Sequence, residues 1–314
     1  MKIETIDLTL IVVSFNTQRL TLGCLQSLYE QTNGLPMEVI VVDNASQDVS
    51  AEAISKHFPQ VHLIRLDKNI GFGPANNLAA KHAKGEWLLL LNPDTVILDG
   101  AIQKLYFFAK EHPEAGIFGG RTFFKDGKLN PTFCWNKPTL WSTFCSGIGL
   151  SAIFKSSPIF DPENIGSRGV DIPHEVDIVS GCFFLIKKEI WDNLGGFNPD
   201  FFMYGEETDL CLRAGKKEIK CMINPNATIV HYGGASGKIR SEKKIRLFKA
   251  KALLFKNHWN KVSAQLGVFM LDGKVFIRMV IFALLQVIKP SKHNDYVMWR
   301  NIWKYRGEWQ NILR

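Results

Sequence analysis

Short apolar runs alternate with helical segments over the first hundred residues. Unbroken apolar runs such as Leu88–Leu91 are typical of strands covered on both faces. The pattern predicts strands over Leu8–Phe15, Met37–Asp43, Val61–Leu66 and Trp87–Leu91, separated by helices over Thr17–Gln31, Val49–Phe58 and Pro74–Lys84. This β-α-β-α-β-α-β order predicts the α/β class, with a mainly parallel, Rossmann-like sheet flanked by helices.

Polar residues stand where the predicted strands end. Ligands of parallel α/β sheets bind outside the carboxyl ends of the strands, so residues at these positions are candidates for binding. They are Ser14 and Asn16 after the first strand, Asp43 and Asn44 after the second, and Asn92 and Asp94 after the fourth.

The pattern changes twice further along the chain. From Phe123 to Asp177 five prolines interrupt it, which indicates loops and small strands that could line an acceptor site. A strand is expected over Val176–Ile186 and a helix over Lys188–Leu194. After Gly237 the chain becomes basic and helix-forming. We therefore expect a body over residues 1–237 and a helical C-terminal region over 238–314.

Composition narrows the class of protein. The chain has 314 residues, of which 46% are hydrophobic and 22% charged, so it has enough apolar residues for a large core. Its six cysteines form no Cys-x-x-Cys pair, which argues against a thiolate zinc site and fits a reduced cytosol.

Signals for secretion or membrane insertion are not evident in the sequence. The first apolar run lacks the basic flank of a secretion signal, and no run reaches the length of about 18 apolar residues that a transmembrane helix needs. A cytoplasmic location is expected.

The charge is unevenly distributed. Residues 238–314 carry 17 Lys and Arg but only 4 Asp and Glu, whereas the whole chain has a net charge of +8. An acidic body therefore carries a basic C-terminal region. Such asymmetry suggests an anionic partner, either nucleic acid or an anionic membrane surface.

The segment Gly71-Phe72-Gly73 is a weak match to a dinucleotide-binding loop. Asn76 replaces the third glycine, and the segment follows the third strand rather than the first. A loop leading into a helix, with Gly73 near the N-cap and Pro74 at the first helical position, explains the same residues. The N-terminal N–H groups of that helix and the Asn76 amide could face a phosphate or a sugar.

Two carboxylates follow buried strands. Asp94 is well placed to hold a metal ion or a diphosphate, although Asn92-Pro93-Asp94 is also a common turn sequence. Asp43 could bind a base N–H or a ribose hydroxyl, or could simply cap its turn.

Three more carboxylates occur within four residues, at Glu206, Glu207 and Asp209, after an aromatic run. A partly desolvated carboxylate has a raised pKa, which suits a general base, whereas a solvated helix start would explain the cluster without chemistry. His231 opens a Gly-rich loop, and both a structural and a metal-binding role are compatible with its position.

Five segments together resemble the inverting family 2 glycosyltransferases with a GT-A fold, and within them the bacterial rhamnosyltransferase-like branch. These segments are Val13–Asn16, Val41–Ser46, Asn69–Asn77, Leu91–Asp94 and Gly195–Leu210. The resemblance extends over roughly Leu8 to Gly237. Each segment alone is weakly specific, but their order and spacing are typical of the family.

The resemblance implies a role for several residues. Asp43 matches the acid that recognises the base of a UDP- or dTDP-sugar, and Asp94 matches the last acid of an Asp-x-Asp motif that holds Mg²⁺ or Mn²⁺ on the donor diphosphate. Asn92 stands where that motif has its first acid. His231 matches a histidine that helps to bind the metal or diphosphate. Glu207 matches the catalytic base, with Glu206 and Asp209 as alternatives. Ser14, Asn16, Gly71, Asn76 and Asn92 are expected to line the nucleotide-sugar site.

These features predict a metal-dependent enzyme that transfers a sugar, rhamnose in particular, from a dTDP- or UDP-sugar to a saccharide or polyprenyl-diphosphate-linked acceptor during cell-surface polysaccharide synthesis. Two alternatives remain at this stage. A nucleotidyltransferase would carry a Gly-rich basic loop after the first strand, where this chain has Ser14–Arg19. A non-catalytic sugar-binding module would not need the acids at 206–209.

The basic C-terminal region also has two interpretations. It could attach the enzyme peripherally to an anionic inner leaflet, or it could be a helical pair packed on the body with a solvated basic face. Nucleic acid is not expected as a partner, because no recognition motif accompanies the charge.

Overall fold

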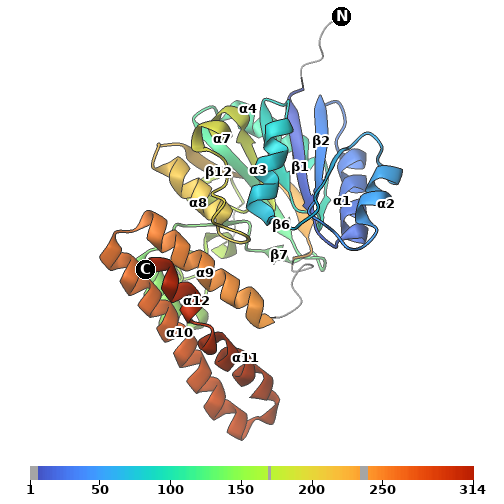
Figure 1. Cartoon of the computed structure of the whole chain (residues 1–314). Coiled ribbons are helices and arrows are strands. Elements are labelled where there is room, and N and C mark those ends of the chain that lie inside the picture. The colour runs from blue at the N-terminus through green and yellow to red at the C-terminus, as the bar shows by residue number, and fades with distance from the viewer. Residues whose placement is uncertain (1–5, 169–170, 234–239) are drawn as a thin grey trace, which may run out of the picture. The chain divides into compact units, whose positions relative to one another are not determined.

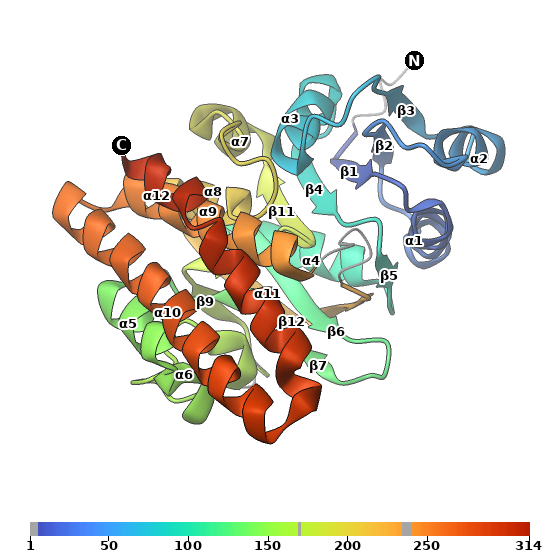
Figure 2. The same cartoon turned by 60° about the horizontal axis from the view of Figure 1, so that its bottom comes forward.

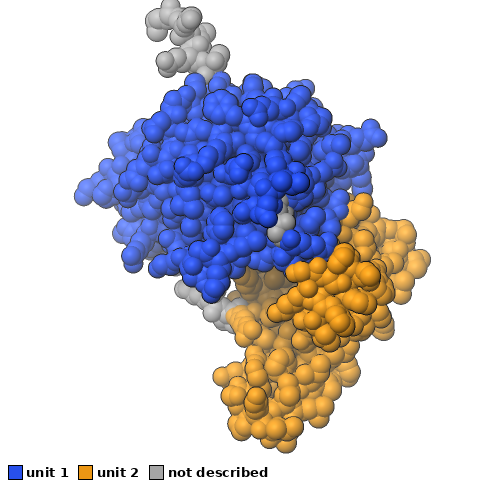
Figure 3. Space-filling view, turned by 180° about the vertical axis from the view of Figure 1, so that it is seen from behind, with its two compact units in different colours: residues 1–136, 164–202, 206–236 blue, residues 137–163, 203–205, 237–314 orange. Residues whose placement is uncertain are grey.

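The computed structural model describes residues 6–168, 171–233 and 240–314, which form two compact units. Unit 1 comprises residues 1–136, 164–202 and 206–236, and unit 2 comprises residues 137–163, 203–205 and 237–314 (Figure 3). Unit 2 therefore contains the C-terminal region together with a segment that the sequence pattern assigned to the body. The division at residue 237 stays a prediction.

A large mixed sheet forms the centre of unit 1. Within the described residues its strands follow the order β3-β2-β1-β4-β11-β6-β12-β5. The strands are β1 (Leu8–Ser14), β2 (Met37–Asp43), β3 (His62–Arg65), β4 (Trp87–Leu91), β5 (Thr95–Ile97), β6 (Ala115–Phe123), β11 (Phe183–Lys187) and β12 (Lys220–His231).

The first four strands form the parallel part of the sheet. β1 pairs in parallel with both β2 and β4, and β2 pairs in parallel with β3. β11 then enters antiparallel between β4 and β6, and β12 runs parallel to β6. This arrangement brings the carboxyl ends of β1, β2, β4 and β12 to one edge of the sheet. The order of elements in the sequence predicts this for β1, β2 and β4.

Helices cover both faces of the sheet because the strand side chains alternate between two cores. Leu8, Leu10 and Val12 of β1 lie in one core and Ile11 and Val13 in the other, and all are buried. The flanking helices are α1 (Gln18–Gln31), α2 (Ser50–His57), α3 (Phe72–His82), α4 (Ala101–Glu111), α7 (Lys188–Leu194) and α8 (Glu206–Gly215) (Figure 1). The predicted α/β class, with a helical C-terminal region, is confirmed.

Three local predictions need correction. A single strand was expected over Val176–Ile186, but the structure has three short strands there: β9 (His174–Val176), β10 (Ile178–Val179) and β11. The chain turns at Asp177 and again at Ser180–Cys182, which separates them. The third helix begins at Phe72, so Pro74 is its third residue. The irregular region contains two helices, α5 (Leu140–Ile148) and α6 (Leu150–Ile153), as well as the short strands β7 (Leu129–Asn130) and β8 (Cys134–Trp135).

Unit 2 is helical. Its long helices are α9 (Arg240–His258), α10 (Lys261–Ile288) and α11 (His293–Lys304), followed by the short α12 (Gly307–Gln310) (Figure 2). They share a core that includes Phe255, Leu271, Trp299 and Trp309. α5 packs beside α10, where Gly147 approaches the backbone of Met270.

All six cysteines are buried and free. Within the described part of the chain, no helix is long and apolar enough to cross a bilayer.

Candidate active site

Asp43 is the last residue of β2, and only one of its two carboxylate oxygens accepts a hydrogen bond from the protein. Its Oδ2 accepts a hydrogen bond from the Ser46 N–H at 3.2 Å. Its Oδ1 is buried and has no hydrogen-bond partner among the described residues. A buried acceptor without a partner is costly, so Asp43 is suited to accept a hydrogen bond from a ligand at this edge of the sheet.

Asn44, which follows Asp43, holds the loop before α3 in place. Its Nδ2 donates to Asn69 Oδ1 and to the Gly71 carbonyl, both at 3.1 Å, and its Oδ1 accepts from the Ile70 N–H at 2.9 Å. The sequence pattern marked Asn44 only as a polar strand end. Its positioning role depends on a contact 25 residues along the chain, which only the fold reveals.

Ser14 and Asn16 serve the loops around this edge. Ser14 is completely buried, and its hydroxyl lies 3.0 Å from Thr21 Oγ1 and 3.1 Å from Thr17 Oγ1. Asn16 has a positive φ of 54°, and its Oδ1 accepts from the Gln47 N–H at 2.7 Å. Ser14 therefore acts inside the fold, whereas Asn16 joins the loops that follow β1 and β2.

The start of α3 is shaped by a close backbone approach. Gly71 has a φ of +94°, and a Cβ there would lie 2.5 Å from the Phe202 carbonyl oxygen. Asn76 is buried and donates to the Phe72 carbonyl at 3.0 Å. Asn77 exchanges two hydrogen bonds with the Phe197 backbone. Both amides have partners within the protein, and the place of Asn76 in the nucleotide-sugar site stays a prediction.

Asp94 and His231 meet where β5 pairs with the end of β12. His231 Nε2 lies 3.3 Å from Asp94 Oδ1 and 3.3 Å from the Asn92 side-chain amide, and the backbone N–H of Tyr232 donates to the Asp94 carbonyl at 3.0 Å. Asp94 is buried, and His231 Nδ1 is buried without a partner among the described residues. The structure thus brings together Asn92, Asp94 and His231, which lie up to 139 residues apart in sequence.

The charge state of His231 depends on this setting. Burial opposes its protonation, but Cys182 and Asp94 outweigh burial and raise the pKa of His231 to about 10. The described residues contain no group of three His, Cys, Asp or Glu side chains able to hold a metal. Asp94 and His231 still fit a divalent cation that takes its remaining ligands from donor phosphates, provided that the imidazole gives up its proton.

The acidic cluster separates into three environments at the start of α8. Glu206 is buried, its Oε2 has no partner among the described residues, and burial together with the charge of Glu207 raises its pKa well above the usual range. Asp209 is buried in an ion pair with Arg213, 2.8 Å from Nε. Arg213 also donates to the carbonyls of Leu194 and Gly196. Asp209 therefore holds Arg213 in the position from which it fixes the chain after α7.

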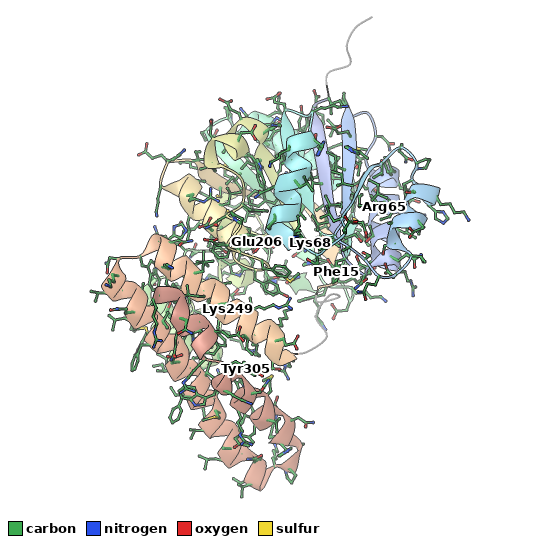
Figure 4. The ribbon with its side chains drawn as sticks, viewed as in Figure 1. Phe15, Arg65, Lys68, Glu206, Lys249 and Tyr305 are labelled. Atoms are coloured by element: carbon green, nitrogen blue, oxygen red, sulfur yellow. The ribbon has the colours of Figure 1, made fainter. Side chains whose placement is uncertain are left out.

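Glu207 lies near Asn92 by way of the two residues that precede β11. A Cβ on Gly181 would lie 3.6 Å from Glu207 Cβ, and the next residue, Cys182, accepts a hydrogen bond from the Asn92 N–H at 3.1 Å. Glu207 is half-buried. In Figure 4, Glu206, Lys68 and Phe15 lie along the edge of unit 1 where the parallel strands end.

The strand ends thus place three features in unit 1 that are candidates for ligand binding: Asp43 with one unpartnered oxygen, the Asp94–His231 pair, and the acids at the start of α8. The sequence profile named "Glycosyl transferase family 2" matches residues 9–195, and the chain belongs to this family. It is a glycosyltransferase of glycan synthesis.

The chain is similar to curated relatives at low identity. An N-acetylglucosaminyl-diphospho-decaprenol L-rhamnosyltransferase of Mycobacterium tuberculosis (strain CDC 1551 / Oshkosh) is 28% identical over 211 residues, which are 63% of this chain and 67% of the relative. The low-salt glycan biosynthesis hexosyltransferase Agl10 of Haloferax volcanii is 23% identical over 296 residues, covering 91% of this chain and 88% of the relative.

Solved structures show the same GT-A fold. The mannosyltransferase PcManGT from Pyrobaculum calidifontis, in complex with GDP-Man and Mn²⁺, has a TM-score of 0.54 and 17% identity over 97% of this chain and 86% of its own. S. aureus TarS also has a TM-score of 0.54, at 16% identity, and the match covers 85% of this chain but only 43% of that protein.

Proposed function

We propose that the protein is an inverting glycosyltransferase that moves a hexose, rhamnose as first candidate, from a dTDP- or UDP-sugar to a saccharide acceptor linked to a polyprenyl diphosphate. The observation that carries this proposal is the grouping of Asp94, His231 and Asn92, together with the hydrogen bond from the Asn92 N–H to Cys182, whose neighbour Gly181 lies next to Glu207. The name of the mycobacterial relative supports the choice of sugar and acceptor.

In this proposal the donor's base lies on Asp43. Its free Oδ1 accepts a hydrogen bond from the N–H of a pyrimidine, while Oδ2 stays fixed by Ser46. Asn44 keeps the loop of Asn69–Gly71 against the same strand end, which gives the nucleotide a preformed wall.

The donor diphosphate lies near Asp94 and His231. These two residues would hold Mg²⁺ or Mn²⁺, and an imidazole ligand favours Mn²⁺. When bound, the cation neutralises charge that develops on the departing nucleoside diphosphate. The buried setting of Asp94 strengthens its interaction with any cation there.

Glu207 is the proposed general base. Inversion requires a carboxylate on the face of the sugar opposite the leaving group, where it accepts the proton of the attacking acceptor hydroxyl. Glu207 is the acid of the cluster that lies against Gly181 beside the site. Asp209 is committed to Arg213, and Glu206 is more deeply buried with a strongly raised pKa, so it favours the neutral form that cannot act as a base.

We also infer a cytoplasmic location with peripheral attachment to the membrane, since a polyprenyl-linked acceptor is embedded in a bilayer. The excess of basic residues in the C-terminal region supports an anionic inner leaflet as the surface.

The proposed function can be tested by a donor screen. The wild-type protein is heated with dTDP- and UDP-sugars, with and without Mn²⁺ or Mg²⁺, and transfer to a polyprenyl-diphosphate-linked saccharide is then measured for the stabilising donor. We expect stabilisation that requires both nucleotide and cation, and its loss in Asp94→Asn. Asp99→Asn is the matched control, because Asp99 forms an exposed ion pair with Lys104 away from these residues. Stabilisation by donor that is equal with and without cation would contradict the metal part of the proposal, and no transfer with any donor would contradict the whole.

A further inference from the structure

The outward face of α10 is an unbroken apolar stripe, which we call the α10 stripe. Its positions recur every three or four residues, the spacing of one helix face. They are Val262, Leu266, Phe269, Gly273, Phe276, Val280, Leu284 and Val287. Phe269 is 73% exposed and Val287 is 80% exposed, and the stripe extends over about 38 Å of helix.

The opposite side of α10 accounts for the helix's own packing. Ala264, Val268, Leu271 and Val275 are buried in the core of unit 2. Asp272, the single acid of the helix, accepts hydrogen bonds from Trp309 and Gln310, and Lys274 donates to Ser146. Asp272 and Lys274 thus have partners within unit 2, while apolar side chains of α10 are exposed to solvent.

The neighbouring helix α5 repeats this feature. Trp141, Phe144 and Ile148 lie three and four residues apart, and each is exposed. α5 packs against α10. Soluble proteins rarely expose large contiguous apolar surfaces unless another surface covers them.

The charges around the stripe identify what covers it. From Lys256 to Lys292 the chain has six basic residues and one acid, with Lys256 and Lys261 at one end of α10 and Lys289 and Lys292 at the other. A second copy of the stripe would bring lysine-rich ends together in either orientation, and like charges disfavour that pairing. An anionic bilayer fits both the apolar stripe and the lysines at its ends. The lysines reach the lipid headgroups, while the apolar side chains enter below them.

We propose that the α10 stripe is the membrane-docking surface, and that α10 lies in the interface of an anionic bilayer without crossing it. This inference deepens the proposed peripheral location by naming its surface and by making insertion of apolar side chains, rather than charge alone, the main source of affinity. It does not depend on the donor or the acceptor.

Vesicle binding of the full chain tests the proposal without donor, acceptor or metal. The vesicles contain phosphatidylcholine with or without phosphatidylglycerol, and binding is measured by sedimentation at low and high salt. The test variant is Phe269→Gln/Leu284→Gln/Val287→Gln, and the matched control is Val49→Gln/Phe107→Gln, which changes exposed apolar residues of unit 1. Circular dichroism and thermal unfolding establish that both variants are folded.

We expect the wild type and the control to bind anionic vesicles and to remain partly bound at high salt. The triple variant should bind at least about tenfold more weakly, because three apolar side chains no longer enter the bilayer. Lys289→Gln/Lys292→Gln should weaken binding only at low salt. Wild-type binding by the triple variant, or no binding by any form, would overturn the proposal. A wild-type dimer that the triple variant dissociates, without vesicle binding, would assign the stripe to a second copy instead.

Discussion

At the scale of single residues, the acidic cluster shows how burial and partners divide chemically similar groups. Asp209 is held by Arg213, Glu206 is desolvated, and Glu207 lies half-buried against Gly181. The sequence spacing alone could not separate these three acids, because all of them lie within one turn of a helix. Their distinct contacts give each a different expected response to neutralisation.

Glu207→Gln should lower turnover by about 10²–10⁴-fold and leave donor affinity unchanged, since it removes the proton acceptor but keeps the shape. Steady-state transfer assays and donor calorimetry measure the two effects. Asp209→Asn is the control: it should lower the free energy of unfolding by about 1–3 kcal/mol through the lost charge-assisted bond to Arg213, with a smaller loss of turnover. An inactive but fully stable Asp209→Asn variant, beside an active Glu207→Gln, would show that the base is wrongly assigned.

Glu206 should make stability depend on pH. Its pKa in the folded state lies well above the usual 4.5 because of burial and of Glu207, so its favourable contribution is complete below pH 4.5 and is lost as pH rises through the folded-state pKa. Glutamine does not ionise. The melting temperature of Glu206→Gln relative to wild type should therefore increase as pH rises from 4 toward 8, as scanning calorimetry would measure. A difference that stays constant over this range would show that Glu206 titrates normally.

At the scale of elements, the loop before α3 depends on Gly71. A methyl group there would meet the Phe202 carbonyl at 2.5 Å, and the residue already has a positive φ. Gly71→Ala should therefore lower the free energy of unfolding by about 1–3 kcal/mol, measured by urea denaturation. Gly23→Ala, in the open environment of α1, should be neutral or stabilising by up to about 1 kcal/mol. Equal effects of the two substitutions would refute this account of the loop.

The elements also show what the sequence could and could not predict. β1, β2 and β4 were predictable because each is a short apolar run whose residues are mostly buried on both faces, whereas β3 at the edge of the sheet is only partly buried. The turn that separates β10 from β11 was not predicted, since apolar residues lie on both sides of Ser180-Gly181, and the two strands pair with different partners, β8 and β4. α5 was hidden among prolines, and its capping by Thr139 and Ser142 is too brief a signal to stand out.

For the site, the strand ends predicted that Asp43 and Asp94 lie at one edge of the sheet; the structure has them at the end of β2 and just after β4, with His231 beside Asp94, and their roles stay a prediction. The pattern could not show that Ser14, Asn76 and Asn77 have protein partners, because those partners depend on packing and on chain segments far away in sequence. The α10 stripe was equally hidden, since a helix that is apolar on both sides shows no contrast between its buried and its exposed face.

At the scale of the whole molecule, the candidate active site lies in unit 1 and the proposed docking surface lies in unit 2, so the two functions should be separable. The triple variant Phe269→Gln/Leu284→Gln/Val287→Gln should slow transfer to a polyprenyl-linked acceptor in vesicles by about tenfold at limiting lipid, in proportion to its weaker binding. Transfer to a short-chain, water-soluble analogue of the acceptor should be unchanged, because no residue of the site is altered. Glu207→Gln should slow both reactions equally. If the triple variant slowed both, the stripe would support the fold of the site, and if it slowed neither, docking through α10 would have no part in catalysis at the membrane.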